Sequence, residues 1–335
     1  MTAQSAPVLE MHELRTWFAT PEGPLRAVDG VSLGVEPGRC LGVVGESGSG
    51  KTVLLRSIVG LLPRRAIAST GGTVCFEGLE LAGAPPAVIR DVRGRRIGMV
   101  FQDPMTSLNP VMRVGTQLTD GMRHHLGVGR QEARRRARAL LEAVGIPDPE
   151  RRLRDYPHQL SGGMRQRVTI AIALACDPSL LLADEPTTAL DVTVQSQILR
   201  LLGRLRRQRN MAVILVTHDM GVVAGSTDDL AVMYAGKVVE QGPTATVFSA
   251  TRHPYTRALL EAIPRADARP GERLATIPGQ PPSLVDPPSG CRFAPRCPRA
   301  ADRCRAEEPP LAGADGHRFA CWFPLGDPEP PAAAT

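Results

Sequence analysis

Short apolar runs alternate with amphipathic stretches from Val8 to about Ala250, and glycine or proline marks most of the boundaries. Runs of this length predict buried strands, and their alternation with helical patterns predicts an α/β domain with a largely parallel sheet over residues 1–250. The clearest predicted strands are Cys40 to Val44, Ile97 to Phe101, Leu180 to Ala183 and Ala212 to Val216.

The pattern changes between Pro104 and Leu160, where no comparable strand run occurs. Apolar residues recur there at helical spacing from Ala133 to Val144, and Gly145 follows as a stop signal. The segment 104–160 is therefore predicted to be a helical subdomain inserted into the α/β domain. The basic run Arg134 to Arg138 lies on this helix, and a solvated helix face explains it better than a nucleic-acid surface.

Beyond His253 the chain becomes rich in proline and poor in strand patterns. We expect residues 251–326 to form a small irregular C-terminal extension that a bound group holds together. The alanine- and proline-rich tail 327–335 is predicted to be disordered. Four of the seven cysteines of the chain lie in the extension: Cys291, Cys297, Cys304 and Cys321.

Composition narrows the class of protein. The 335 residues are 42% hydrophobic, which is enough to fill a sizeable core. The net charge of +6 comes almost wholly from arginine, since Lys51 and Lys237 are the only lysines, so it is weak evidence for a nucleic-acid partner. The N-terminus has no basic start followed by an apolar run, and no stretch approaches the roughly 20 apolar residues of a membrane span. We expect neither secretion by a signal peptide nor a membrane span.

A glycine-rich motif follows the first predicted core strand and precedes a helical stretch. Its residues are Gly45, Glu46, Ser47, Gly48, Ser49, Gly50, Lys51 and Thr52. Strand, loop and helix in this order form the context of a phosphate-binding loop. Backbone N–H groups can face an anion there, Lys51 can reach the β and γ phosphates, and the Thr52 hydroxyl can ligate Mg²⁺. The alternative, a glycine-rich turn that happens to hold a lysine, explains less.

Two adjacent carboxylates, Asp184 and Glu185, end the apolar strand that starts at Leu180. The carboxyl edge of an open α/β sheet is where such folds bind ligands. Asp184 suits the magnesium shell, directly or through water, and Glu185 suits activation of the attacking water as a general base. Alone, such a pair is more often an ordinary strand exit. The phosphate-loop motif strengthens the functional interpretation.

The run Leu160 to Arg167 resembles the signature sequence of the ABC ATPase family, with Met164 where many members have glutamine. The resemblance covers about residues 8 to 250 and implies a P-loop ABC-type nucleotide-binding domain. Physically, Ser161 and the Gly163 amide begin a helix and so offer a second anion site. In the family this site meets the γ phosphate held by an opposite subunit, so the chain resembles half of an ATP sandwich.

Other family elements follow in the expected order. Gln102 resembles the loop glutamine that senses magnesium and water, and Asp191 resembles the aspartate at the dimer crossing. His218 resembles the switch histidine that contacts the γ phosphate and orients the catalytic glutamate. Phe18 resembles the aromatic residue that stacks on adenine, and its neighbour Trp17 competes for that role. The resemblance therefore implies ATP and Mg²⁺ as cofactors and ATP hydrolysis as the activity.

The stretch His253 to Leu260, followed by Ile263 and Pro264, resembles the C-terminal extension of ATPases from peptide and nickel importers. Peptide import is the favoured function, ahead of metal and other small solutes. The resemblance implies two transmembrane permeases, a second ATPase that is a homologous chain or another copy, and an extracytoplasmic solute-binding protein as an indirect partner. It places the chain peripherally at the cytoplasmic face of the membrane.

The extension's cysteines are separated by five, six and sixteen residues, without the close spacing of zinc ribbons. Disulfides are disfavoured because an ATP-dependent motor works in the reducing cytosol. Four thiolates suit a [4Fe-4S] cluster, and members of the resembling importer branch carry one here. Zinc and unligated thiols remain alternatives.

A rival function is a soluble ABC ATPase that acts on nucleic acid or the ribosome. Such machines usually carry paired ATPase domains or a long coiled-coil insertion. This sequence has one phosphate-loop motif, one signature run and no sustained heptad pattern, so transport is favoured and no nucleic-acid partner is expected.

Overall fold

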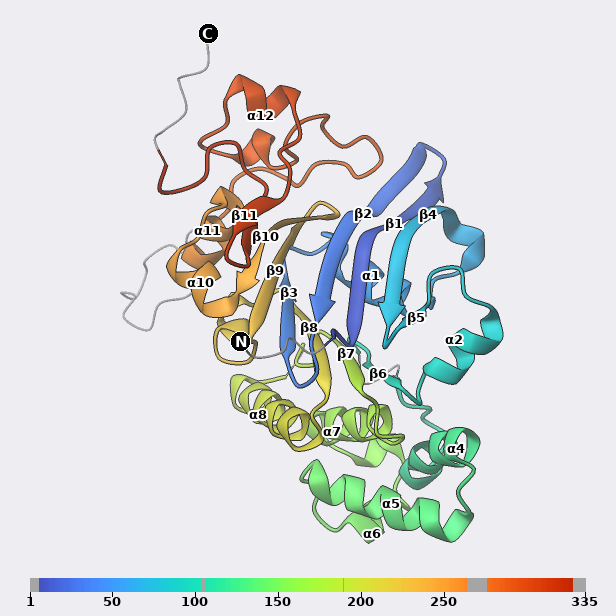
Figure 1. Cartoon of the computed structure of the whole chain (residues 1–335). Helices are drawn as coiled ribbons and strands as arrows, with labels where there is room; N and C mark the ends of the chain where they lie inside the picture. Colours follow the sequence, from blue (N-terminus) through green and yellow to red (C-terminus); the bar gives the residue numbers. More distant parts are fainter. Residues whose placement is uncertain (1–5, 104–106, 189, 264–275, 328–335) are drawn as a thin grey trace. The chain divides into compact units, whose positions relative to one another are not determined.

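The computed structural model describes residues 6–103, 107–188, 190–263 and 276–327 (Figure 1). Backbone contacts divide the chain into two compact units that interleave along the sequence. The first unit consists mainly of Cys75–Val216, with Gly34–Cys40 added, and the second combines Glu10–Leu33 and Leu41–Val74 with the described residues from Thr217 onward. The sequence predicts a boundary between two domains near residue 250. These interleaved units do not test that boundary, which stays a prediction.

Three parallel strands form the sheet of the first unit. They are β6 (Ile97–Val100), β7 (Leu180–Asp184) and β8 (Ala212–Thr217), and β7 pairs with both of the others. Nearly every residue of these strands is buried, as expected for parallel strands covered on both faces. The strands predicted from apolar runs are confirmed to within one residue at either end. A short strand, β5 (Leu79–Glu80), pairs with the end of β4 (Ile67–Phe76).

Helices occupy the chain between β6 and β7, and α4 packs against both α5 and α7. The described part of 104–160 contains helices, and its standing as an inserted subdomain stays a prediction; residues 104–106 lie outside the described residues. Buried positions of α5 include Ala133 and Leu141, whereas Arg134 pairs with Glu150 on the exposed side, so the basic run is a solvated face. The helices of this unit are α2 (Pro86–Val92), α4 (Val114–Leu126), α5 (Arg130–Ala143), α6 (Pro149–Arg152), the single turn η2 (Pro157–Gln159), α7 (Gly162–Ala173) and α8 (Val192–Arg209).

The second unit contains two groups of strands. In one group, β3 pairs in parallel with β9. Three antiparallel pairs then extend the group from β9 to β10, from β10 to β12 and from β12 to β11. In the other, the order is β2, β1, β4. The bounds are β1 (Leu9–Thr20), β2 (Gly23–Val35), β3 (Cys40–Val44), β9 (Asp229–Tyr234), β10 (Lys237–Pro243), β11 (Ala312–Ala314) and β12 (His317–Phe319).

The C-terminal extension is more regular than its proline content suggests. Residues 312–319 form a β-hairpin, and β12 pairs with β10. Asp315 and Gly316 make its two-residue turn with φ of 52° and 77°, the left-handed values that an Asp-Gly turn adopts. Within the otherwise irregular extension, this segment is therefore a regular element. Of the tail predicted to be disordered, residues 328–335 lie outside the described residues.

The helices of the second unit are short. They are α1 (Lys51–Ile58), η1 (Arg64–Ala66), α9 (Met220–Ala224), α10 (Thr244–Ser249), α11 (Pro254–Glu261), η3 (Ala294–Arg296) and α12 (Asp302–Ala306). Figure 1 shows α10 and α11 beside β10 and β11. Among all described residues, no helix has both the length and the apolar character needed to cross a membrane.

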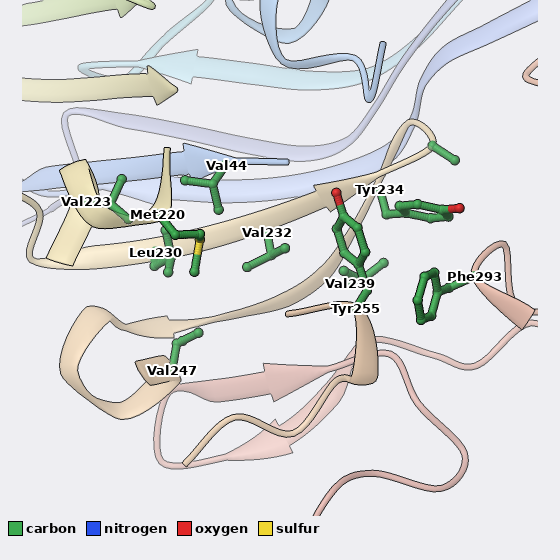
Figure 2. Close-up of a cluster of buried hydrophobic side chains, with 11 residues drawn as sticks. Val44, Met220, Val223, Leu230, Val232, Tyr234, Val239, Val247, Tyr255 and Phe293 are labelled. Atoms are coloured by element: carbon green, nitrogen blue, oxygen red, sulfur yellow. The ribbon is translucent and has the colours of Figure 1, made fainter. Parts of the chain in front are cut away.

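A buried apolar cluster ties the extension to the strands of its unit (Figure 2). Tyr234 of β9, Tyr255 of α11 and Phe293 form its aromatic part, with ring centroids 4.5 to 5.3 Å apart. All three side chains are almost completely buried. Tilted and edge-on rings at such distances attract one another beyond the effect of burial. The extension is thus packed into the core of the second unit.

Candidate functional site

The loop between β3 and α1 is folded so tightly that two of its positions require glycine. Gly45 has a φ of 153° and Gly50 a φ of 101°, and a Cβ at either position would lie 2.1 Å from a backbone carbonyl oxygen. Helix α1 begins at the next residue, Lys51, so the loop amides and the helix N-terminus lie together. This is the arrangement that favours a bound anion.

Lys51 is only 5% exposed, and its ammonium lies over the loop. Its Nζ donates to the carbonyl oxygens of Gly45 at 2.7 Å and Glu46 at 2.9 Å. Ser49 Oγ lies 3.4 Å from the same nitrogen. An ammonium in a glycine-rich loop at a helix N-terminus can bind the oxygens of a polyphosphate. Phosphate binding by residues 45–52 stays a prediction.

At the acidic end of β7, in the first unit, the side chains of Gln102 and Thr188 contact Glu185. Asp184 is fully buried, and Glu185 is 9% exposed with a strained φ of 46°. The Glu185 carboxylate accepts hydrogen bonds from Thr188 Oγ1 at 2.9 Å and from Gln102 Nε2 at 3.1 Å. These bonds fix the orientation of the carboxylate, as a general base requires.

Gln102 and Glu185 are 83 residues apart in the sequence, and both were predicted as site residues. Thr188 follows Glu185 by three residues, a spacing that allows a local hydroxyl–carboxylate bond. Because the amide nitrogen of Gln102 donates to Glu185, its amide oxygen is left to accept or to ligate a cation.

Two further predicted residues cap helices of the first unit. Ser161 is the N-cap of α7, where its hydroxyl accepts from the N–H of Met164 at 3.4 Å. Gly163 lies in the first turn, and a Cβ there would come within 2.9 Å of Val194 on α8. Asp191 is the N-cap of α8. The predicted helix start at the signature sequence is confirmed, with an exposed Ser161 at its end.

The remaining predicted residues lie in the second unit. His218 is exposed, just before Asp219, whose carboxylate caps α9. Of the two competing aromatic residues, Trp17 donates from Nε1 to Asp29 at 3.2 Å and has the guanidinium of Arg26 over its ring. Phe18 is half-buried. These contacts give Trp17 a structural role and leave Phe18 the better candidate for stacking.

The four cysteines of the extension line one small pocket with largely apolar walls, including Phe293, Trp322 and Phe323. Burial raises the pKa of Cys291 to about 11 and that of Cys321 to about 12, and it also raises the pKa of Cys297. His253, completely buried at the same pocket, has its pKa lowered to about 3 by desolvation. Within the described residues, no group of three or more His, Cys, Asp or Glu side chains is arranged to hold a metal ion.

Fold and site together define a nucleotide-dependent phosphate-loop enzyme, and comparison with known proteins refines that class. The ABC transporter family matches residues 28–188, and the family called oligopeptide/dipeptide transporter, C-terminal region, matches residues 239–304. The oligopeptide transport ATP-binding protein OppD of Salmonella typhimurium is 47% identical over 97% of both chains. The dipeptide transport ATP-binding protein DppD of Escherichia coli is 50% identical over 96% of this chain and 98% of its own.

Solved structures of ABC ATP-binding proteins are similar to this chain in fold. The dimeric ATP-binding cassette MJ0796, in a post-hydrolysis state bound to ADP and Pi, is 27% identical with a TM-score of 0.63, covering 70% of this chain and 98% of its own. The structure of cbiO1 from Clostridium perfringens, part of an ABC transporter complex, has a TM-score of 0.62 at 28% identity, covering 73% and 92%. The chain belongs to the ATP-binding subunits of ABC transporters, in the branch with the oligopeptide/dipeptide C-terminal region. It is therefore an ATPase that works with ATP and Mg²⁺.

Proposed function

We propose that this chain hydrolyses ATP to energise the import of di- or oligopeptides through an ABC transporter. The observation that carries the proposal is the union, in one chain, of an ABC cassette with the peptide-transporter C-terminal region, at about half identity to OppD and DppD over almost the full length. The phosphate loop and the Gln102–Glu185 contact support an active ATPase rather than a degenerate one.

Binding of ATP begins at the phosphate loop. Backbone amides of the loop and the ammonium of Lys51 hold the β and γ phosphates. Oxygen donors suit Mg²⁺, and the family motif offers the Thr52 hydroxyl, the Asp184 carboxylate and the Gln102 amide for its shell. Asp184 fits that role because it is a buried carboxylate at a strand end. Bound Mg²⁺ supplies charge neutralisation of the phosphates.

Hydrolysis relies on Glu185, which polarises the attacking water as a general base. Gln102 and Thr188 orient its carboxylate through the hydrogen bonds described above. His218 acts as the switch residue toward the γ phosphate, and Phe18 stacks on adenine. Ser161, Gly163 and Asp191 serve the nucleotide held by a second ATPase subunit, so two subunits close around ATP.

ATP-driven closure then moves two membrane permeases, and the cargo arrives through an extracytoplasmic solute-binding protein. The second ATPase is a homologous chain, and the complex places this subunit peripherally at the cytoplasmic face of the membrane. Closure of this kind is a population shift, because ATP binds the closed pair better than the open pair.

We also propose that Cys291, Cys297, Cys304 and Cys321 hold a [4Fe-4S] cluster. Four thiols on one apolar pocket supply the donor set of such a cluster. A single zinc ion needs its sulfurs about 2.3 Å from one point, whereas a cluster spreads four thiolates over separate irons. The shared pocket and its apolar walls support the cluster, and zinc is the alternative.

Metal analysis after anaerobic purification tests the cluster. The proposal predicts about four irons per chain and a broad visible absorption band. Stoichiometric zinc without that band would contradict it.

Peptide uptake tests the main proposal. Cells whose own copy is replaced by the Glu185→Gln variant should lose uptake of a labelled dipeptide and a labelled tripeptide, while uptake of a labelled free amino acid serves as the control. Unchanged uptake of both peptides would contradict a role in peptide import.

A further inference from the structure

Glu46, the second residue of the phosphate loop, is bound by two residues of the C-terminal extension. Its backbone N–H donates to the hydroxyl of Tyr255 at 2.9 Å. Its carboxylate forms a two-pronged ion pair with Arg296, at 2.7 Å from Nη1 to Oε2 and 3.0 Å from Nη2 to Oε1. A forked pair of this type fixes both the position and the orientation of the carboxylate.

Arg296 is well placed to act as a rigid anchor. Its side chain is 3% exposed, and the Glu46 side chain is 28% exposed. The guanidinium also donates to the carbonyl oxygens of Pro278 and Ile277 and to the hydroxyl of Tyr234. Its hydrogen bonds to Glu46 raise the pKa of Arg296 further, so it remains a cation.

The charge of Glu46 matters because the loop must attract a polyanion. A carboxylate inside a phosphate-binding loop repels the phosphates unless a cation neutralises it. Arg296 supplies that cation from 250 residues away in the sequence. It lies outside every ATPase motif recognised in the sequence.

The turn that carries Arg296 is itself held in place. Turn η3 starts with Ala294, whose N–H donates to the carbonyl of Cys291, and the N–H of Cys297 donates back to Ala294. The preceding Phe293 packs into the aromatic cluster with Tyr255 (Figure 2). The cysteine pocket and the aromatic cluster therefore fix the position of Arg296.

We propose that Arg296 is a positioning residue for the phosphate loop: by pairing with Glu46 it orders the loop and cancels a negative charge that would oppose ATP. The affinity of this chain for ATP then depends on its C-terminal extension. The inference rests on the proposed function in one respect, namely that residues 45–52 bind the phosphates of ATP.

Equilibrium binding of Mg-ATP to the purified full chain tests the inference. Arg296→Gln should raise the Kd for Mg-ATP about tenfold, or about 1.4 kcal/mol. This is the order of the repulsion between an unpaired, partly exposed Glu46 carboxylate and a nearby phosphate charge. The KM for ATP should rise with it, while kcat changes less than about twofold, since the groups of hydrolysis are untouched. Adding Glu46→Gln to Arg296→Gln should bring the Kd back to within about threefold of the wild type, because the uncompensated charge is gone.

Each outcome separates charge compensation from a general role in folding. A wild-type Kd for Arg296→Gln would overturn the inference, and so would a weakened Kd that Glu46→Gln does not rescue. If Arg296→Gln does not fold, Arg296→Lys is measured instead; it keeps the charge but loses the fork, and its Kd should rise about threefold. A Kd raised tenfold or more in that variant, although the charge is kept, would overturn the inference.

Lys51→Ala distinguishes failure of the inference from failure of the proposed phosphate site. Normal ATP binding by Lys51→Ala would overturn the phosphate site itself. Lost binding in Lys51→Ala, together with normal binding in Arg296→Gln, would overturn only the role of Arg296.

Discussion

Replacing Glu185 with glutamine should stop hydrolysis without preventing ATP binding. In the structure the carboxylate accepts from Thr188 Oγ1 and from Gln102 Nε2. The oxygen of a glutamine side chain at this position can accept the same bonds, so the shape of the site is kept. What is lost is basicity, because an amide does not take a proton from water at neutral pH.

A positioned general base typically contributes about 10² to 10⁴ in rate, which corresponds to about 2.7 to 5.5 kcal/mol of the activation barrier. We therefore expect kcat for phosphate release to fall by about 10² or more, while the Kd for Mg-ATP stays within about threefold of the wild type. Steady-state phosphate release and equilibrium binding by the same preparation measure the two quantities.

A matched variant separates basicity from positioning. Thr188→Val removes one hydrogen bond to Glu185 but leaves the carboxylate, so its kcat should fall by no more than about tenfold. Turnover of Glu185→Gln within threefold of the wild type would refute the assignment, and it would place the base elsewhere. An equal loss in both variants would show that orientation, not basicity, limits the rate.

Three further predictions concern other parts of the chain. Lys51→Ala should lose ATP binding, measured by equilibrium titration, because the buried ammonium is the main point charge of the loop. Asp191→Ala should lower the free energy of unfolding by about 1 kcal/mol in denaturant titration, since it removes the N-cap acceptor of α8, while Asp191→Asn keeps most of the stability; equal losses would contradict the capping role. Cys304→Ser should lose iron and the visible absorption band under anaerobic purification, and full iron content in that variant would exclude Cys304 as a ligand.

The parts of the fold that could be predicted are those with local signals. Buried parallel strands appear as apolar runs, and β7 and β8 follow those runs closely. The phosphate loop was predictable because glycine is required at Gly45 and Gly50 by backbone contacts that no Cβ could tolerate. The hairpin of the extension also had a local signal, the Asp-Gly pair at 315–316, but the surrounding proline-rich composition outweighed it.

Contacts between distant residues were beyond reach from one sequence. Family resemblance assigns Gln102 and Glu185 separate roles at the ATP site, and neither residue signals the hydrogen bond between them. The pairing of Arg296 with Glu46 had no signal at all, because arginine is abundant in this chain and a buried, forked ion pair leaves no local pattern. Packing of the whole extension decides that contact.

Isolation of the tagged chain from gently solubilised membranes, followed by mass spectrometry of its companions, tests whether this chain drives a peptide transporter. We expect two permeases, a second ATPase and a receptor that binds peptides in a ligand panel. Recovery of ribosomal or DNA-repair proteins, with no permease, would contradict it.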